Sequence, residues 1–284
     1  MFQTRLENIL QQKIISFQKV GGGCISKAQK IVTEVGDEFF LKTDSVAASF
    51  SKEANGLIEI AKSKTLIVPN IIAVDNDFLL LQYIEPGLTS PDFFIDFAKQ
   101  YAEMHRYTSE SFGFYEDNFL GSSLQPNRPL GDEANNWPLF FFNKRLNYQF
   151  SLVEQNGYAT DELRHLFSQL ENKFDTILNA PIEPPCLLHG DLWAGNFMIN
   201  KAGKAVLIDP AVYYGNREAD LAMTSIFGGF PQVFYDAYHA AYPLADGWEY
   251  RQNIYKLYHI LNHLNLFGVS YYDEAIALIK YYVQ

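Results

Sequence analysis

Short runs of alternating apolar and polar residues fill the first part of the chain, and turn-forming residues separate them. Runs at 14–20 and 24–35 flank the three glycines of Gly21–Gly23, and a further run at 36–43 begins with the Gly36-Asp37 pair. Alternation bounded by glycine and aspartate is typical of strands joined by tight turns. After a first helix at the N-terminus, the pattern predicts an antiparallel β-meander.

A change of period follows this meander. Between Ser45 and Ser63 the apolar positions recur at helical spacing, which predicts one buried helix face. Its residues are Phe50, Ala54, Leu57, Ile58 and Ala61. The runs "PNIIAVD" and "FLLLQYI" then predict two more strands joined at Asn76-Asp77.

Beyond residue 85 the chain becomes mainly helical. Helical patterns cover 91–107, 137–153 and 161–178, and the tyrosine-rich stretch 235–258 predicts further helices with aromatic core contacts. We therefore predict an α+β chain with a small β-rich lobe at 1–85, containing one key helix, and a larger, mainly helical lobe at 86–284.

One hairpin interrupts the helical part. The apolar runs Phe197–Ile199 and Val206–Ile208 surround the turn "NKAGK". If the chain folds back at Ala202, Asn196 and Asp209 come to lie at the same open end, and Asp191 precedes them on the incoming loop. The pattern predicts that three polar groups converge there.

Composition and charge exclude several kinds of partner. The 284 residues are 48% hydrophobic, enough for a sizeable core, and 33 acidic against 22 basic residues give a formal charge of −11. This charge repels nucleic acid and anionic lipid, and no run of about 18 apolar residues predicts a membrane span. Two distant cysteines, Cys24 and Cys186, favour a reducing compartment, so we expect a cytoplasmic protein.

The candidate chemistry combines Asp191, Asn196 and Asp209. Asp191 lies five residues before Asn196, which resembles the spacing of kinase catalytic loops, and Asp209 follows a short apolar strand as metal-binding aspartates do there. Each residue alone is also compatible with a turn or a helix cap. Together and in this order, they predict a phosphotransfer site with oxygen ligands for Mg²⁺.

A second set of residues suits a nucleotide. Lys42 ends the run "FFLK", and Glu53 on the next predicted helix is placed to hold it as an ion pair. Glycines, which lack side chains, allow backbone N–H groups to approach phosphates, but from these residues alone a loose hairpin turn is the simpler explanation. The glycine positions are Gly21, Gly22 and Gly23. The backbone of the "LQYIEPG" segment is the candidate adenine contact, at Gln82, Tyr83 and Ile84.

Other polar and aromatic residues admit simpler explanations. His259 and His263 lie four apart on a predicted helix, but no cysteine or carboxylate nearby completes a metal site. His189 is expected to brace its loop. Trp193 either fills the interior or offers its ring to a sugar or a cationic amine. Cys186 is expected to be a buried thiol.

The motifs together resemble one family. "GGGCIS", "FFLK", "KEANGL", "FGFYEDNFLG" with "QPN", "WPLFFFNKRL", "LLHGDLWAGN" and "LIDPAVYYGNREADLAM" are similar to those of fructosamine kinases (ketosamine 3-kinases). That family lies within the group of protein-kinase-like folds that includes aminoglycoside phosphotransferases and choline kinases. The resemblance covers about 14–267, and "HGDLWAGN" and "YYGNREADLAM" are its most specific parts.

The resemblance implies a bilobal kinase that uses ATP and Mg²⁺ to phosphorylate the 3-hydroxyl of a ketosamine, free or protein-bound, and so promotes deglycation as protein repair. By this resemblance Asp191 is the catalytic base, Asn196 and Asp209 bind Mg²⁺, and Lys42 with Glu53 binds phosphate. Trp193 and Arg217 are substrate candidates. Alternatives are a kinase for an aminoglycoside, choline or a sugar, and a nucleotide-binding pseudokinase, although the Lys and both Asp residues that pseudokinases tend to lose are present.

Cys24 follows the glycines at the predicted loop tip. An exposed thiol there, beside N–H groups that favour the thiolate, predicts a redox switch in which two molecules join through Cys24. The alternative is a small residue turned inward under the loop. We otherwise expect a monomer.

Overall fold

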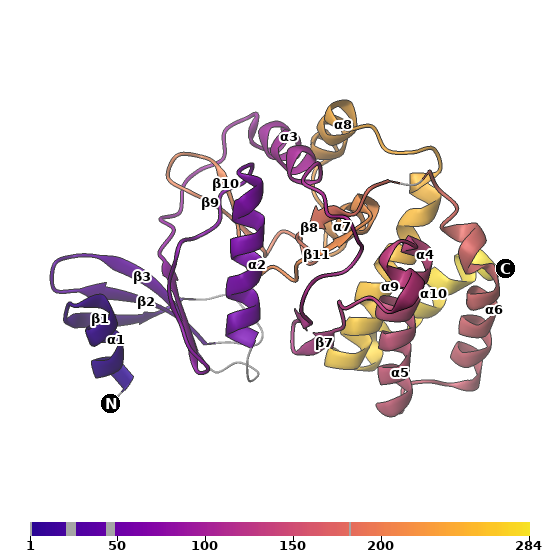
Figure 1. Cartoon of the computed structure of the whole chain (residues 1–284), viewed down its shortest axis with the longest axis horizontal. Helices are drawn as coiled ribbons and strands as arrows, with labels where there is room; N and C mark the ends of the chain where they lie inside the picture. The colour runs from indigo at the N-terminus through magenta and orange to yellow at the C-terminus, as the bar shows by residue number, and fades with distance from the viewer. Residues whose placement is uncertain (1, 21–26, 44–48, 182) are drawn as a thin grey trace. The chain divides into compact units, whose positions relative to one another are not determined.

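The computed structural model of the chain describes residues 2–20, 27–43, 49–181 and 183–284. They form two compact units (Figure 1). Unit 1 comprises Met1–Phe93 with Gly195–Pro210, and unit 2 comprises Phe94–Ala194 with Ala211–Gln284. The hairpin near residue 200, which the predicted division assigns to the later lobe, therefore packs with the N-terminal residues.

A five-stranded antiparallel sheet forms the framework of unit 1, in the order β1-β2-β3-β5-β4. Its strands are β1 (Ile14–Lys19), β2 (Lys27–Thr33), β3 (Glu38–Thr43), β4 (Ile71–Val74) and β5 (Phe78–Gln82). The first three follow one another in the sheet, so the predicted meander is confirmed. Strand β5 lies between β3 and β4 and is buried over Phe78–Leu81, as its continuous apolar run requires.

Two helices, α1 (Phe2–Leu10) and α2 (Ser49–Ser63), supply the apolar side chains that cover the two faces of this sheet. Successive residues of a strand point to opposite faces. Accordingly Phe78 and Leu80 pack in the cluster that includes Leu6 of α1, and Leu79 and Leu81 pack in the cluster that includes Leu57 of α2. The strand therefore joins two separate apolar layers.

The buried face of α2 differs in part from the prediction. Phe50, Ala54 and Leu57 are buried as expected, but Ile58 is 48% exposed and Ile60 is buried instead. Residue 58 is a full 100° further around the helix than residue 57. Ala61 is exposed as well. The buried face of α2 therefore includes Ile60, and the predicted face was wrong at Ile58 and Ala61.

The predicted hairpin is present. It consists of β9 (Phe197–Ile199) and β10 (Ala205–Leu207), with Phe197 opposite Leu207. Backbone hydrogen bonds join it to the rest of unit 1, from Leu207 N to Ile67 O at 2.9 Å and from Gly87 N to Ile199 O at 2.8 Å. At Gly87 an added Cβ would lie 2.0 Å from Asn200 O, so only glycine fits this close approach.

Unit 2 is mainly helical. Its helices are α3 (Phe93–Met104), η1 (Gly131–Ala134), α4 (Trp137–Phe141), η2 (Phe142–Asn147), α5 (Tyr148–Gln155), α6 (Asp161–Ile177), α7 (Arg217–Thr224), α8 (Gln232–Ala241), α9 (Trp248–Phe267), η3 (Val269–Tyr271) and α10 (Tyr272–Val283). Two short antiparallel pairs complete it: β6 (Asn118–Leu120) with β7 (Ser123–Gln125), and β8 (Cys186–Leu188) with β11 (Tyr213–Gly215). The helices predicted at 91–107, 137–153 and 161–178 are confirmed, except that the second contains the π-helical turn η2.

Every residue of helix α7 in unit 2 is buried. The side chain of Asn216 caps its N-terminus by accepting a hydrogen bond from Glu218 N at 2.9 Å. Helix α9 packs against it, and Tyr238 of α8 and Tyr255 and Tyr258 of α9 are each at most 2% exposed. The predicted aromatic core is confirmed, and α7 carries charged residues into it.

Candidate active site

Lys42 makes ion pairs with two carboxylates in unit 1. Its Nζ lies 2.9 and 2.8 Å from the two oxygens of Glu53 and 2.8 Å from Asp209 Oδ1. The Lys42 side chain is 8% exposed, whereas that of Asp209 is 41% exposed. We call these three residues the Lys42 cluster. The expected contact between Lys42 and Glu53 is therefore present, and Asp209 joins it from the hairpin.

The sequence accounts for this convergence. Leu41 packs with Phe78 and Leu80, so its neighbour Lys42 points to the opposite face of β3, which α2 covers. Glu53 lies in the second turn of α2, and Asp209 follows β10 with a left-handed φ of 54°. Such a φ is uncommon outside glycine, asparagine and aspartate, and it marks a constrained backbone position beside the cluster.

One ammonium group, that of Lys42, faces the two carboxylates of Glu53 and Asp209. The pKa values of Lys42 and Glu53 reflect this arrangement. Burial raises the pKa of Glu53 to about 7, and the charge of Asp209 acts in the same direction, while Lys42 opposes both. For Lys42, burial alone would lower the pKa, but the two carboxylates raise it above its ordinary value. The lysine stays protonated, and once Glu53 loses its proton above about pH 7 the cluster has one negative charge in excess, which a second cation can neutralise.

The open end of the hairpin supplies oxygen ligands suited to Mg²⁺. Ile208 N donates to Asn196 O at 3.1 Å, so the hairpin brings residues 196 and 208–209 together as predicted. Asn196 and Asp209 offer amide and carboxylate oxygens, the donors that Mg²⁺ prefers. The contact with Lys42 shows that the Asp209 carboxylate accepts a cation, so these residues fit the ion. Among the described residues no cluster of three His, Cys, Asp or Glu competes for a metal.

The loop that carries Asp191 is held by its backbone in unit 2. Ala211 N donates to His189 O at 2.9 Å, and Asp191 N donates to His189 Nδ1 at 3.3 Å. Gly190 has φ +81°, and a Cβ there would lie 2.1 Å from Ala211 O. His189 is fully buried, and its predicted role of bracing the loop is confirmed. These contacts hold the backbone from His189 to the N–H group of Asp191.

Asp220 of α7 holds the same loop from another side. Its Oδ2 accepts from His189 N at 2.6 Å and from Tyr101 at 2.6 Å, and its Oδ1 accepts from Gly190 N at 2.8 Å. His105 Nε2 lies 3.3 Å from Oδ2, and its Nδ1 lies 2.7 Å from the Tyr238 hydroxyl. We call Asp220, Tyr101, His105 and Tyr238 the Asp220 cluster.

The Asp220 cluster satisfies a buried charge with neutral donors. Burial alone would raise the pKa of Asp220, but the hydrogen bonds from His105 and Tyr101 hold it below its ordinary value. Burial also lowers the pKa of His105, which favours a neutral ring that donates from Nε2 and accepts at Nδ1. The sequence analysis missed this cluster, although a carboxylate within the apolar "ADLAM" stretch was the available signal.

Aromatic residues adjoin Trp193, two positions after Asp191. The Trp193 ring meets that of Phe227 edge-on at 5.8 Å, and the Phe227 ring lies 4.8 Å from that of His263. Phe227 has a left-handed φ of 56° and remains 41% exposed, and two glycines with positive φ follow it. A bulky residue in that conformation is an outlier, and such strain concentrates at functional sites. Trp193 thus contributes to a half-open aromatic surface.

Arg217 does not fit its predicted role. The side chain is 1% exposed and forms a two-pronged ion pair with Glu183, at 2.9 and 2.7 Å. It also donates to the carbonyls of Tyr242 and Pro243, and its guanidinium lies 3.6 Å from the centre of the Tyr242 ring. Because its donors are engaged and buried, Arg217 braces the segment after α8 rather than contacting a substrate. The sequence did not reveal these distant partners.

The predicted adenine segment is only partly available. Gln82 N donates to Asn70 O at 2.8 Å within the sheet, so this group is already paired. For Tyr83 and Ile84, we find no backbone hydrogen bond within the part of the chain that the structure describes. Lys30 lies 4.2 Å from the centre of the Tyr83 ring. The backbone groups that remain available for the predicted contact with adenine are those of Tyr83 and Ile84.

Four predicted residues, Gly21, Gly22, Gly23 and Cys24, lie outside the described residues. Their predicted roles at phosphate and in redox control stay predictions. Cys186, by contrast, is fully buried, and burial raises the pKa of its thiol to about 12. It is the buried structural thiol that the sequence predicts.

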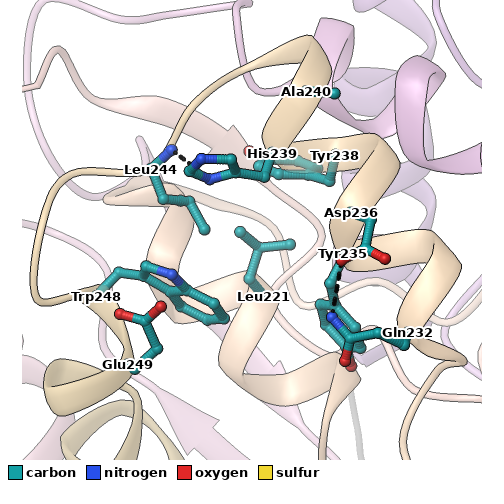
Figure 2. Close-up of a pocket in the computed structure, with 10 residues that line it drawn as sticks. All are labelled: Leu221, Gln232, Tyr235, Asp236, Tyr238, His239, Ala240, Leu244, Trp248 and Glu249. Atoms are coloured by element: carbon teal, nitrogen blue, oxygen red, sulfur yellow. Dashed lines mark hydrogen bonds between the residues drawn. The ribbon is translucent and has the colours of Figure 1, made fainter.

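A separate hollow of about 360 Å³ lies in unit 2 among residues of α7, α8 and α9. Figure 2 shows Leu221, Leu244 and the indole of Trp248 on its apolar side, and Asp236, held by Gln232, on its polar side. The described residues that line it include none that was predicted for catalysis. Tyr238 alone is shared with the Asp220 cluster.

Comparison with known proteins agrees with the geometry. The family model "Fructosamine kinase" matches residues 2–284. The chain is 37% identical over 281 residues to the chloroplastic protein-ribulosamine 3-kinase of Arabidopsis thaliana, covering 96% of this chain and 84% of that protein. It is 34% identical over 285 residues to a Vibrio parahaemolyticus protein assigned as a ketoamine kinase, covering 96% and 94% respectively.

Solved structures extend the agreement to the fold. A crystal structure assigned as a fructosamine-3-kinase from Haemophilus somnus has a TM-score of 0.86 and 27% identity, covering 100% of this chain and 97% of that one. An ADP-bound aminoglycoside phosphotransferase has a TM-score of 0.62 at 14% identity, covering 99% and 96%, which shows a shared fold alone. The predicted kinase-like α+β fold is confirmed. Among the described residues no helix is both long and apolar enough to cross a bilayer.

Proposed function

Because this chain belongs to the fructosamine kinase family, we propose that it transfers the γ-phosphoryl group of ATP to the 3-hydroxyl of a ketosamine. A ketosamine is the rearranged adduct of a sugar and an amine. The relatives named ketoamine kinase and protein-ribulosamine 3-kinase support this substrate class. The observation that carries the proposal is the Lys42 cluster, in which a buried ammonium holds two carboxylates from separate segments.

Lys42 would neutralise the nucleotide phosphates, and Glu53 would keep its ammonium in place. A buried lysine with a raised pKa stays charged and therefore suits a phosphate. The backbone of Tyr83 and Ile84 would bind the adenine edge, with Gly21, Gly22 and Gly23 along the phosphates. Solved structures of the same fold that contain AMP or ADP support this use of a nucleotide.

Asn196 and Asp209 would hold Mg²⁺. When bound, the ion neutralises charge that develops on the transferring phosphoryl group. The protein's part is to present two oxygen donors from one rigid hairpin end, where the Ile208–Asn196 backbone bond sets their separation. Lys42 would release part of its hold on Asp209 when the ion is present, since Asp209 is the more exposed of its two carboxylates.

Asp191 would act as the base that accepts the proton of the acceptor hydroxyl. Its loop backbone is fixed by Ala211 and Asp220, so the carboxylate is presented in a defined position. The half-open surface of Trp193 and Phe227 would receive the sugar or the amine-bearing part of the substrate. Phosphate leaves more readily than hydroxide, so the 3-phosphate promotes elimination that frees the amine, which is deglycation.

The test measures ATP turnover with a panel of acceptors: ribulosyl-lysine, fructosyl-lysine, kanamycin and choline. We expect ADP release with a ketosamine, and phosphorus NMR of the product locates the phosphate on the 3-hydroxyl. Stimulation by kanamycin or choline alone would contradict the substrate class, and binding of ATP without turnover of any acceptor would favour a pseudokinase. The cytoplasmic location, the monomeric state and the Cys24-linked dimer stay predictions.

A further inference from the structure

Three of the motifs that carry the family resemblance have no part in the site described above. They are "EDNFLG", "QPN" and "NKRL", and they contribute Asn118, Gln125, Asn127 and Arg145. In unit 2 these side chains lie together, each at most 3% exposed. Four large polar side chains in one buried place require an explanation, because each must find hydrogen-bond partners there.

The bonds of this network end on backbone next to the Asp191 loop. Gln125 Nε2 donates to Ala211 O at 2.9 Å, and Asn118 Nδ2 donates to Val212 O at 2.7 Å. Side-chain amides thus satisfy two consecutive carbonyls. Ala211 is also the residue whose N–H donates to His189 O, and whose carbonyl faces the Cβ position of Gly190. The Ala211 carbonyl is therefore confined between Gly190 and Gln125.

The remaining bonds make the network rigid. Gln125 Nε2 also donates to Asn118 Oδ1 at 2.8 Å, and its Oε1 accepts from the Tyr258 hydroxyl at 2.7 Å. Asn127 Nδ2 donates to Asn118 Oδ1 at 2.8 Å. Every polar group of Gln125 is thus used. A buried amide whose donor and acceptor groups are all paired has one low-energy arrangement, so it fixes the position of the carbonyl that it binds. Arg145 Nε, by contrast, is buried without a hydrogen-bond partner among the described residues.

Arg145 supports the network from the π-helical turn η2. Its Nη2 donates to Asn127 Oδ1 at 2.7 Å and its Nη1 to Pro126 O at 2.6 Å, and its guanidinium lies 4.0 Å from the centre of the Tyr213 ring. No carboxylate within the described part of the chain forms an ion pair with it. The carbonyl of Pro126 and the face of the Tyr213 ring stabilise the positive charge of Arg145. The π-helical turn η2 sets the position of this side chain.

We propose that Gln125, supported by Tyr258 and the Asn118–Asn127–Arg145 network, is a positioning residue that holds the Asp191 loop through Ala211. The proposal rests on the proposed function, in which Asp191 is the base. Two contacts connect Gln125 to the loop: Gln125 to Ala211 O, and Ala211 N to His189 O. Asp220 holds the opposite edge at His189 N and Gly190 N. Burial raises the pKa of Tyr258, and the Asp191 charge contributes to that rise, which agrees with this proximity.

The chain offers a matched control for Gln125. Gln149 is also fully buried, and its amide exchanges hydrogen bonds with Asn262 and Asn265 of α9 rather than with the loop. Gln125→Met and Gln149→Met remove the same groups from equally buried places. Both variants should melt several degrees below the parent, since each leaves buried partners unpaired.

The readouts separate positioning from stability. In Gln125→Met we expect kcat to fall about 10- to 100-fold, with the KM for ketosamine and the Kd for MgATP within about twofold, because a small displacement of a catalytic group is enough to slow the reaction. Hydrogen exchange of His189 and Gly190 amides should be at least tenfold faster. Gln149→Met should change neither quantity by more than about twofold. Equal behaviour of the two variants would overturn the proposal.

If Gln125→Met does not fold, a second pair of variants with smaller changes tests whether Gln125 positions the loop. Tyr258→Phe removes only the hydroxyl that donates to Gln125, and Tyr255→Phe removes a buried hydroxyl that accepts from Trp137 at 3.0 Å. We expect a three- to tenfold loss of kcat and faster loop exchange in the first and neither in the second. If the parent itself phosphorylates no ketosamine, the proposed function fails, and the exchange comparison still tests whether Gln125 holds the loop.

Discussion

The Lys42 cluster and the Asp220 cluster are both built on carboxylates, but they satisfy them in opposite ways. In the first, a cation bridges two carboxylates, one of which is 41% exposed. In the second, one carboxylate that is 1% exposed accepts from two backbone N–H groups, a tyrosine and a histidine. In the Lys42 cluster, the exposed Asp209 carboxylate can leave Lys42 and bind another cation. The second has no ligand to exchange and serves to hold backbone.

The largest effect on turnover is expected at Asp191, whose loop the Asp220 cluster holds. Asp191→Asn keeps the size of the side chain but removes the base, so turnover should fall about 10²- to 10⁴-fold. Nucleotide affinity should stay within about twofold, as calorimetry with MgATP can measure. Unchanged turnover would remove Asp191 from the mechanism.

The next largest effect is a difference in the free energy of unfolding between variants of the two clusters. Asp220→Asn replaces an acceptor oxygen with an amino group that faces donors, so we expect a loss of about 2–4 kcal/mol in the free energy of unfolding. Asp209→Asn should change it by less than about 0.5 kcal/mol, since that side chain is partly solvated and Glu53 still pairs with Lys42. Urea denaturation of both variants makes the comparison. Equal losses would mean that the open cluster is as structural as the closed one.

A third test asks whether the open cluster exchanges cations. Asp209→Ala should weaken the binding of MgATP about tenfold or more and that of metal-free ATP far less, because the ion loses a carboxylate ligand. Calorimetry with and without Mg²⁺ gives both values. Equal weakening in the two titrations would assign Asp209 to the fold rather than to the metal.

The smallest effect concerns pH and Glu53. Since burial raises the pKa of Glu53 from 4.5 to about 7, the folded protein holds a proton there between these pH values that the unfolded chain releases. The stabilisation is complete below about pH 4.5 and is lost as the pH rises through 7, by about 1–3 kcal/mol. Glu53→Gln lacks this dependence. The melting temperature of the parent relative to the variant should therefore decline from pH 5 to pH 8; a constant difference would contradict the raised pKa.

Local patterns predicted the parts of the site that depend on short stretches of chain. A two-strand hairpin must bring Asn196 and Asp209 to one end, and alternation in β3 together with the next helix places Lys42 against Glu53. The hairpin and the contact between Lys42 and Glu53 are confirmed. The family and the fold class, which rest on motif resemblance rather than on spacing, are confirmed by the comparisons with known proteins.

Long-range contacts were not predictable in this way. Asp220 meets Tyr101 across 119 residues, and Gln125 meets Tyr258 across 133, and no periodicity connects such positions. Arg217 was misjudged for the same reason, because Glu183 and the carbonyls after α8 occupy its donors only in the folded chain. The sequence shows which residues are polar. Whether such a residue faces a substrate or another side chain depends on tertiary packing.

The route of the chain through the hairpin has a consequence for synthesis. Unit 1 is complete only when Leu207 and Ile199 have bonded to Ile67 and Gly87. About 120 residues must be translated between Gly87 and Leu207, which takes roughly 6–24 s at typical elongation rates. During this time Ile67 and Gly87 lack the backbone partners that the hairpin provides in the folded chain. The nascent chain is therefore expected to be a chaperone client until the hairpin emerges.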